Sequence, residues 1–358
     1  MLLNENWDFE TAVREISQKY YAGGITTGPL RNRQIESWGQ LVGKTRATGE
    51  FNAAIELHGS LSAFGRAYRV SLPILQGFRK FFENLPDDQV KDTVFAGLEL
   101  GNWKLLRRLG RGGNANVWAA KKTKKPSALA AIKILKRARG AGLRRFIAEI
   151  TILQQLGNFP GILPLVDSIS LENIEQDRYV WLVIPIATPL LETINEQTLS
   201  SSDIVCGVTQ IAHTLKELHS LNITHRDIKP DNLYSWNNMW VISDFGIASF
   251  PQKETLTLAQ KKLGPLHYLA PEMLEHADNA DAKKADVYSL AKTLWVLLTG
   301  QNYPPPGEQR RDVPAFHIAE WCDVQHPDVV DDLIESSTRH NPDKRPTMNE
   351  FLNVLREI

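Results

Sequence analysis

The feature that most constrains this chain is the run HRDIKPDN at residues 225–232. It places a carboxylate (Asp227), an ammonium (Lys229) and an amide (Asn232) within six residues. This spacing is too close for all three groups to share one face of a helix or strand, so we predict that a loop gathers them. Taken alone, the run could also be a polar loop with chance spacing.

A second carboxylate follows twelve residues after Asn232, in Asp244-Phe245-Gly246. Gly246 lets the backbone turn sharply. Asn232 and Asp244 supply the oxygen ligands that Mg²⁺ prefers, and Mg²⁺ is usually bound together with substrate phosphates. Asp227 is then free to orient a hydroxyl nucleophile. Together the two motifs resemble the catalytic loop and the magnesium motif of protein kinases.

A glycine-rich stretch precedes these motifs, after a predicted strand at residues 103–109. Glycines let backbone N–H groups approach phosphates closely. The kinase pattern is G-x-G-x-x-G-x-V, and Gly110, Gly112 and Val117 match it. Ala115 stands where the third glycine is expected, which leaves the geometry of the loop open.

The resemblance also gives roles to Lys133 and Glu149. Lys133 ends the strand-like run Ala131-Ile132-Lys133, and in the family this lysine contacts the α- and β-phosphates of ATP. Glu149 lies sixteen residues later in a predicted helix, where an active kinase pairs a glutamate with that lysine. The alternatives are a solvated strand lysine and a surface helix glutamate.

Residues 179–186 form a continuous apolar run that is typical of a buried strand. By resemblance the hinge beside the adenine follows it, with Ile184 at the back of the pocket. Pro185 has no N–H, so this hinge offers fewer donors than usual. The residues that the resemblance places around the nucleotide are Gly110, Arg111, Gly112, Gly113, Val117, Ala131, Lys133, Glu149, Ile184, Ile186 and Ala187.

In the catalytic half, the resemblance implies that Asp227 orients the substrate hydroxyl and Lys229 neutralises the transferring phosphoryl group. Asn232 and Asp244 would hold Mg²⁺. Lysine two residues after the catalytic aspartate is typical of serine/threonine rather than tyrosine kinases. One departure weakens that preference: residues 264–265 are Gly-Pro, where serine/threonine kinases usually carry Gly-Thr.

Three further positions match structural sites of the family. Glu272, in the A-P-E at residues 270–272, is expected to pair with Arg345, and Asp286 to brace the catalytic loop. Between the motif at Asp244 and this A-P-E, Thr255 and Thr257 are candidate regulatory phosphosites beside several lysines, where a phosphate of roughly −2 charge could be held by cations. The alternative is that both are ordinary exposed loop threonines.

Charge is distributed unevenly, although the 358 residues have no net charge. Residues 101–150 carry 14 basic side chains and a single acid, Glu149. A basic cluster in this segment comprises Lys121, Lys122, Lys124 and Lys125. It is either a solvated surface or a docking patch for an acidic protein segment, nucleic acid or anionic membrane, with nucleic acid the least favoured partner.

Cys206 and Cys322 are the only cysteines, and they form no disulfide framework, which fits a reducing cytosol. The chain has no apolar run approaching ~18 residues, and its first residues lack the pattern of a signal peptide. We therefore expect a cytoplasmic protein without a transmembrane segment.

Apolar residues at helical spacing predict an all-helical region before the strand at residue 103. Asp8 is a candidate N-cap, and Pro73 fits the first turn of a helix. The helical stripes lie at residues 9–20, 35–42, 51–64, 72–85 and 90–98. Because no Gly/Ser/Pro linker follows, we expect this region to pack on the kinase strands rather than swing freely.

These observations predict an α+β, two-lobed protein-kinase fold at residues 101–358, preceded by a helical domain of residues 1–100. The small lobe would span residues 101–186 and the large lobe residues 187–358. The expected activity is Mg²⁺- and ATP-dependent transfer of the γ-phosphoryl group to serine or threonine hydroxyls of proteins, including the chain itself. The alternatives are a pseudokinase scaffold and a kinase-fold enzyme with a non-protein substrate.

Overall fold

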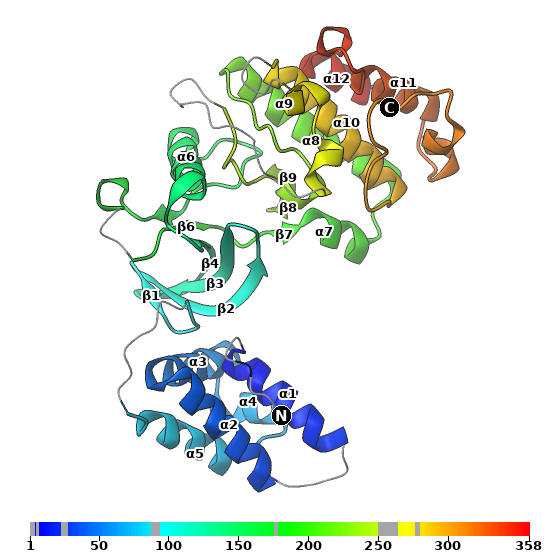
Figure 1. Ribbon diagram of the computed structural model, residues 1–358. Helices are drawn as coiled ribbons and strands as arrows, with labels where there is room; N and C mark the ends of the chain where they lie inside the picture. Colours follow the sequence, from blue (N-terminus) through cyan, green and yellow to red (C-terminus); the bar gives the residue numbers. More distant parts are fainter. Residues whose placement is uncertain are drawn as a thin grey trace. The chain divides into compact units, whose positions relative to one another are not determined.

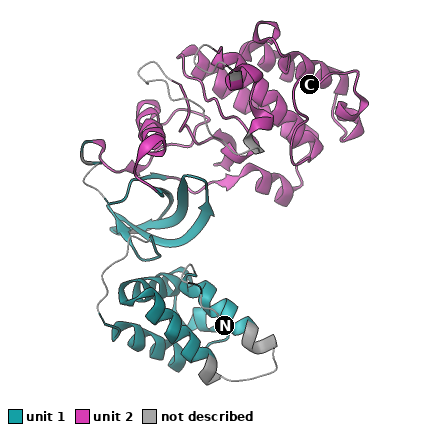
Figure 2. Ribbon diagram, in the orientation of Figure 1, with its two compact units in different colours: residues 1–136, 172–183 teal, residues 137–171, 184–358 magenta. Residues whose placement is uncertain are grey.

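The computed structural model describes residues 4, 7–22, 28–86, 94–174, 178–249, 264–275 and 280–358. The chain forms two compact units, which are coloured separately in Figure 2. Unit 1 comprises residues 1–136 and 172–183, and unit 2 comprises residues 137–171 and 184–358. Each unit is described by itself below. Within the described residues, no helix is long and apolar enough to cross a membrane.

Unit 1 begins with helices, as the apolar stripes predicted (Figure 1). They are α1 (Phe9–Ala22), α2 (Gly28–Val42), α3 (Lys44–Leu57), α4 (Leu61–Tyr68) and α5 (Leu72–Glu83). Asp8 caps α1, since the N–H of Thr11 donates to its Oδ1 at 2.7 Å. Pro73 lies in the first turn of α5, where its missing N–H costs no hydrogen bond.

The core of these helices is aromatic and is centred on Phe9, which is fully buried. Its ring centroid lies 5.1 Å from that of Phe51, 5.6 Å from that of Phe64 and 6.0 Å from those of Trp38 and Phe82. Aromatic pairs at such distances add to the free energy gained from burial alone. One apolar core therefore joins helices that are short individually.

Two details of the helical region were predicted wrongly. The stripe at residues 51–64 is not one helix, because a turn at Gly59 (φ 80°) separates α3 from α4. No helix forms at residues 94–98 either. There the N–H of Gly97 donates to Leu105 O at 2.7 Å, so the chain pairs with a strand instead. Residue 90, at the start of that predicted helix, lies outside the described residues.

The remainder of unit 1 supplies strands to a sheet in which β1, β2, β3 and β4 pair antiparallel in sequence order and β6 lies next to β4. Its strands are β1 (Glu99–Leu100), β2 (Trp103–Arg111), β3 (Ala115–Lys122), β4 (Lys125–Leu135) and β6 (Trp181–Ile184, whose last residue belongs to unit 2). The predicted strand at residues 103–109 is confirmed. The predicted strand at residues 179–186 is also present, but shorter at both ends.

Helix α3 contacts the start of the sheet within unit 1. A Cβ added at Gly97, whose φ is 95°, would lie 2.7 Å from Gly49 O, so two glycine backbones meet there without side chains between them. Beside this contact, the Glu56 carboxylate forms an ion pair with Lys121 and lies 3.5 Å from the ammonium of Lys104. Part of the predicted basic cluster is thus neutralised within the chain itself.

Unit 2 is mainly helical. Its helices are α6 (Gly140–Leu156), α7 (Leu190–Gln197), α8 (Ser201–Ser220), α9 (Pro271–Glu275), α10 (Ala282–Thr299), α11 (Pro327–Ser337) and α12 (Met348–Leu355). Its short strands are β5 (Asp167–Ser168), β7 (Thr188–Pro189), β8 (Leu233–Trp236) and β9 (Met239–Ile242). Short 3₁₀ turns occupy Pro230–Asn232, Gly264–Tyr268, Pro314–Phe316, Ile318–Glu320 and Pro342–Lys344, and a further one at Leu171–Asn173 begins in unit 2 and ends in unit 1.

Helix α8 supports the hairpin formed by β8 and β9. A capping box of Ser200 and Asp203 starts the helix, which reaches Ser220 just before the loop at residues 225–232. A Cβ added at Gly207 would lie 2.3 Å from the Trp240 ring, so the tryptophan packs directly on the helix backbone. This contact fixes the hairpin against α8, and the hairpin carries the candidate site at its ends.

Candidate active site

The loop at residues 225–232 gathers the three groups that its sequence predicted. Lys229 Nζ lies 2.9 Å from Asp227 Oδ2, and the two side chains are 13% and 15% exposed. Asn232 Nδ2 donates to the backbone oxygen of Asp227 at 2.7 Å. A carboxylate, an ammonium and a side-chain amide therefore lie together at one partly exposed place in unit 2.

Asp286 holds this loop from below, as predicted. It is fully buried in α10. Its carboxylate accepts hydrogen bonds from the main-chain N–H of His225 at 2.9 Å and of Arg226 at 2.7 Å. His219 Nε2, at the end of α8, lies 2.9 Å from the same carboxylate. Hydrogen bonds to the charged form compensate the cost of burying this carboxylate.

His225 is a scaffold residue to which the sequence gave no role. It is fully buried, and its ring meets that of Phe245 edge-to-face at 4.8 Å. Nε2 lies 3.1 Å from Ser243 O, and Nδ1 lies 3.3 Å from the N–H of Asp227. These partners fit a neutral ring protonated at Nε2, and burial lowers the pKa of His225. The ring thus ties the catalytic loop to the motif at Asp244.

The β8–β9 hairpin brings Asn232 and Asp244 to the same end. Leu233 pairs with Ile242 across the hairpin, and the N–H of Ser243 donates to Asn232 O at 2.9 Å. Asp244 follows with a φ of 66°, a left-handed backbone that is rare outside glycine. Such strain persists only where surrounding contacts impose it, and it is common at functional sites.

The donor set here fits a Mg²⁺ ion held partly by substrate phosphates. The amide nitrogen of Asn232 is used for the Asp227 carbonyl, which fixes the orientation of its Oδ1. Among the described residues, no three acidic, histidine or cysteine side chains converge on a metal site of their own. An amide and a carboxylate oxygen, completed by phosphates and water, are characteristic of Mg²⁺ rather than of an all-protein metal cage.

In unit 1, the sheet aligns three of the predicted nucleotide residues in one row. Gly110 on β2 pairs with Val117 on β3, and Val117 pairs with Lys133 on β4. Directly opposed residues of antiparallel strands project from the same face, so Val117 and Lys133 share a face. Ala131, two residues before Lys133, also shares this face and is buried.

The glycine-rich stretch forms the turn between β2 and β3. The N–H of Gly112 donates to Ala115 O at 2.9 Å and closes the turn. An added Cβ would meet nothing within 4 Å at Gly110 or Gly113, and neither has a positive φ. The fold itself therefore does not require glycine at these two positions. Their bare backbone leaves room for a ligand to approach.

The other predicted nucleotide residues occupy both units. Glu149 is buried in the middle of α6 in unit 2, whereas Lys133 belongs to unit 1, so their pairing stays a prediction. Ile184, at the end of β6, is half-buried. Ile186 is 43% exposed, and Ala187 is half-buried beyond the strand. Arg111 is exposed at the end of β2. The candidate phosphosites Thr255 and Thr257 lie outside the described residues.

The predicted pair of Glu272 and Arg345 is confirmed. The guanidinium donates to both carboxylate oxygens, at 2.6 and 2.8 Å, in the bidentate geometry that suits these two groups. The side chain of Arg345 is fully buried and also lies over the Tyr288 ring, 4.9 Å from its centroid. This pair links the start of α9 to the segment before α12.

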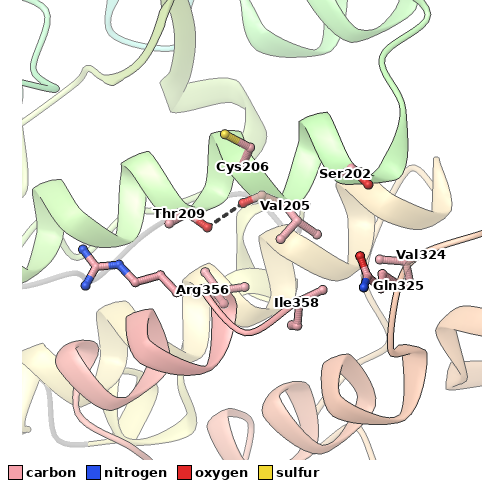
Figure 3. Close-up of a pocket in the computed structure, with 9 residues that line it drawn as sticks. Ser202, Val205, Cys206, Thr209, Val324, Gln325, Arg356 and Ile358 are labelled. Carbon is pink, nitrogen blue, oxygen red and sulfur yellow. Dashed lines mark hydrogen bonds between the residues drawn. The ribbon is translucent and has the colours of Figure 1, made fainter.

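A separate cavity of about 240 Å³ lies in unit 2 between α8 and the C-terminal segment (Figure 3). None of the predicted site residues lines it. Its lining comprises Ser202, Val205, Cys206, Thr209, Val324, Gln325, Leu355, Arg356 and Ile358. Thr209 Oγ1 is used internally, since it donates to Val205 O at 2.8 Å. We assign this cavity no part in the chemistry of the loop.

Comparison with known proteins decides the family. Residues 103–355, most of the chain, match the protein kinase domain family. The chain belongs to the protein kinase family. The match confirms the resemblance to protein kinases, and the names of the relatives given below confirm its serine/threonine branch. The observed helices and antiparallel sheet confirm the predicted α+β class, with helices at residues 9–83 before the kinase domain.

Curated relatives of this kinase-family chain are named as serine/threonine kinases. A probable serine/threonine-protein kinase PknB of Lactococcus lactis is 30% identical over 61% of this chain and 34% of its own length. The serine/threonine-protein kinase PknE of Mycobacterium tuberculosis is 28% identical over 70% of this chain and 44% of its own length. A probable serine/threonine-protein kinase of Clostridium perfringens, CPE1738, is 28% identical over 73% of this chain and 39% of its own length. The matches thus span less than half the length of these relatives.

Proposed function

We propose that this chain transfers the γ-phosphoryl group of ATP to serine or threonine hydroxyls of proteins, itself included, with Mg²⁺ as the metal. The observation that carries the proposal is the convergence of Asp227, Lys229 and Asn232 in one loop, with Asp244 beside it at the end of the β8–β9 hairpin. The names of the relatives favour a protein hydroxyl as the acceptor.

Each group has a task that follows from its chemistry. Asp227 accepts a hydrogen bond from the substrate hydroxyl and so orients its oxygen for attack. Lys229, held beside Asp227, stabilises negative charge that develops on the transferring phosphoryl group. Asn232 and Asp244 would hold Mg²⁺, which when bound offsets charge on the ATP phosphates.

In unit 1, the row of Gly110, Val117 and Lys133 supports nucleotide binding. Lys133 would contact phosphates from the sheet, and the open backbone at Gly110 and Gly113 would allow phosphates to approach its N–H groups. The buried carboxylate of Glu149 fits a partner of opposite charge, and we propose Lys133 for that role. Ile184, Ile186 and Ala187 would line the adenine.

The test is a phosphoryl-transfer assay with the purified chain, Mg²⁺–ATP and a generic protein acceptor. Phosphoserine or phosphothreonine should appear in the acceptor, and Asp227→Asn and Lys133→Ala should each remove most of it while the melting temperature is kept. Nucleotide binding without turnover by the wild type would instead support a pseudokinase scaffold. Phosphate on small hydroxyl compounds but on no protein would support a non-protein substrate.

A further inference from the structure

Lys136 is fixed next to the glycine-rich turn by its own backbone. It directly follows β4, whose last residue, Leu135, pairs with Ala115 on β3. The N–H of Lys136 donates to Asn114 O at 2.9 Å, which extends this ladder to the turn. The position of its Cα is therefore set by the sheet, and its side chain starts within reach of the turn.

The side chain of Lys136 uses that position to bind the turn. Its Nζ lies 2.5 Å from Gly112 O and 3.5 Å from Gly113 O. An ammonium donating to a carbonyl forms a charge-assisted hydrogen bond, which is stronger than one between neutral groups. The lysine thus spans from the end of β4 to the two glycine carbonyls at the tip of the turn.

The turn has few other means of holding its shape. At Gly113 no neighbour lies where a Cβ would be, and glycine loses more conformational freedom than any other residue when it is ordered. The hydrogen bond from Gly112 N–H to Ala115 O closes the turn but leaves the peptide after Gly113 to rotate. A contact to its carbonyl restricts that rotation.

The direction of these carbonyls decides where the adjacent N–H groups point. In a planar trans peptide, the C=O of one residue and the N–H of the next point in opposite directions. When the carbonyls of Gly112 and Gly113 face Lys136, the N–H groups of Gly113 and Asn114 face away from it. Successive N–H groups turned to one side form a site for an anion.

We propose that Lys136 is a positioning residue: it binds the carbonyls of Gly112 and Gly113 and so turns the N–H groups of Gly113 and Asn114 toward nucleotide phosphates. The phosphate acceptor rests on the proposed function, whereas the ordering of the turn does not. Lys136 acts through the turn and does not contact the phosphates itself. Direct contact with the phosphates from the sheet is the role proposed for Lys133.

The experiment compares Lys136→Met and Lys136→Arg with a matched control, Lys124→Met, which removes an exposed lysine beyond the other end of β3. Amide hydrogen exchange of Gly112, whose N–H donates to Ala115 O and closes the turn, is measured in the nucleotide-free protein. We expect roughly tenfold faster exchange in Lys136→Met, the factor for one charge-assisted hydrogen bond. Lys136→Arg should retain slow exchange, and Lys124→Met should match the wild type.

ATP binding and turnover supply the second readout. Lys136→Met should raise the KM for ATP by roughly tenfold and change kcat less than twofold, with recovery in Lys136→Arg. Unchanged exchange with weakened ATP binding would overturn the proposal, since Lys136 would then contact the nucleotide directly. Unchanged exchange and unchanged KM would also overturn it. A wild-type chain that binds no nucleotide would contradict the proposed function. In that case, faster exchange in Lys136→Met would still support the ordering of the turn by Lys136.

Discussion

Single residues at the catalytic loop are placed by the main chain as much as by side chains. Asp227 is held through its N–H by His225 and through its carbonyl by Asn232, so the direction of its carboxylate follows from a fixed backbone. Asp244 has a left-handed φ of 66° that the hairpin contacts impose. The direction of each group therefore depends on the contacts that hold the main chain around it.

Asp244→Asn should weaken nucleotide binding only when Mg²⁺ is present, because it removes one ligand charge and leaves the side-chain volume unchanged. We expect the Kd for Mg²⁺–ATP to rise by at least roughly 10-fold, the smallest loss typical when a group that only supports a metal ligand is removed. Calorimetry with and without EDTA measures this effect. The control, Asp343→Asn, replaces an exposed aspartate before α12 and should bind like the wild type. An equal loss in EDTA would show that Asp244 does not act through the metal.

Glu50 predicts a pH dependence for the helical region. Burial raises the pKa of this carboxyl to about 7, although Arg46 donates to it at 2.8 Å. The folded state then binds a proton that the unfolded state releases above its ordinary pKa of 4.5. The protonated carboxyl therefore stabilises the helical region fully below pH 4.5. This stabilisation, on the order of 3 kcal/mol, is lost as the pH rises through 7.

Glu50→Gln should remove this dependence. The melting temperature of α1–α5 should fall between pH 5 and pH 8 in the wild type. In the variant it should stay nearly constant, since glutamine does not titrate. Parallel curves for the two proteins would show that Glu50 does not control the transition.

At the scale of elements, the candidate site depends on how one hairpin meets one helix. β8 and β9 place Asn232 and Asp244 at their shared end, and Trp240 on β9 lies directly against the bare backbone of α8 at Gly207. Helix α10 supplies Asp286 to the loop that leads into the hairpin. Helix–hairpin packing therefore fixes the separation of the candidate metal ligands from Asp227.

Gly207→Ala should destabilise unit 2, because the new Cβ would lie 2.3 Å from the Trp240 ring and the ring would have to move. Overpacking of this kind costs about 1–3 kcal/mol. Gly77→Ala in α5 is the matched control: its Cβ meets nothing within 4 Å, and alanine favours a helix by up to about 1 kcal/mol. Denaturant unfolding measures both. If Gly207→Ala is as stable as Gly77→Ala, the close packing is not a constraint.

At the scale of the whole molecule, the helical region and the sheet belong to one unit. Gly49 on α3 meets Gly97 backbone to backbone, and Glu56 forms ion pairs with Lys104 and Lys121 of the sheet. Close approach of two glycines needs a fixed geometry, because no side chain is present to adapt. These contacts agree with the expectation that the helical region packs on the strands rather than swinging freely.

Glu56→Lys should loosen this contact by placing a third cation beside Lys104 and Lys121. Each partly exposed pair contributes at most about 1 kcal/mol, so the expected change is a melting temperature lower by a few degrees. Hydrogen exchange at residues 95–105 should become faster. Glu83→Lys makes the same charge change at an exposed position on α5 and should have little effect. Identical exchange in both variants would rule out an electrostatic role for Glu56.

Sequence by itself identified the family, and it predicted the residues of the candidate site. The order and spacing of Gly110, Lys133, Asp227 and Asp244 can be read along the chain, without any knowledge of long-range contacts. Helical periodicity likewise identified α1 and α5, because the apolar face of a helix repeats at a fixed spacing along the sequence. Capping by Asp8 and Pro73 in the first turn of α5 were predictable for the same reason.

Tertiary structure alone decided which long-range partners complete these elements. Residues 94–98 have the apolar spacing of a helix, but the left-handed Gly97 and a hydrogen bond to Leu105 make them part of a sheet edge. Nothing in the sequence indicates that His225 bonds Ser243, that Lys136 reaches Gly112, or that Glu56 meets Lys121. Such contacts depend on backbone distances that are set by packing across the whole core. The spacing of residues along the chain therefore does not predict them.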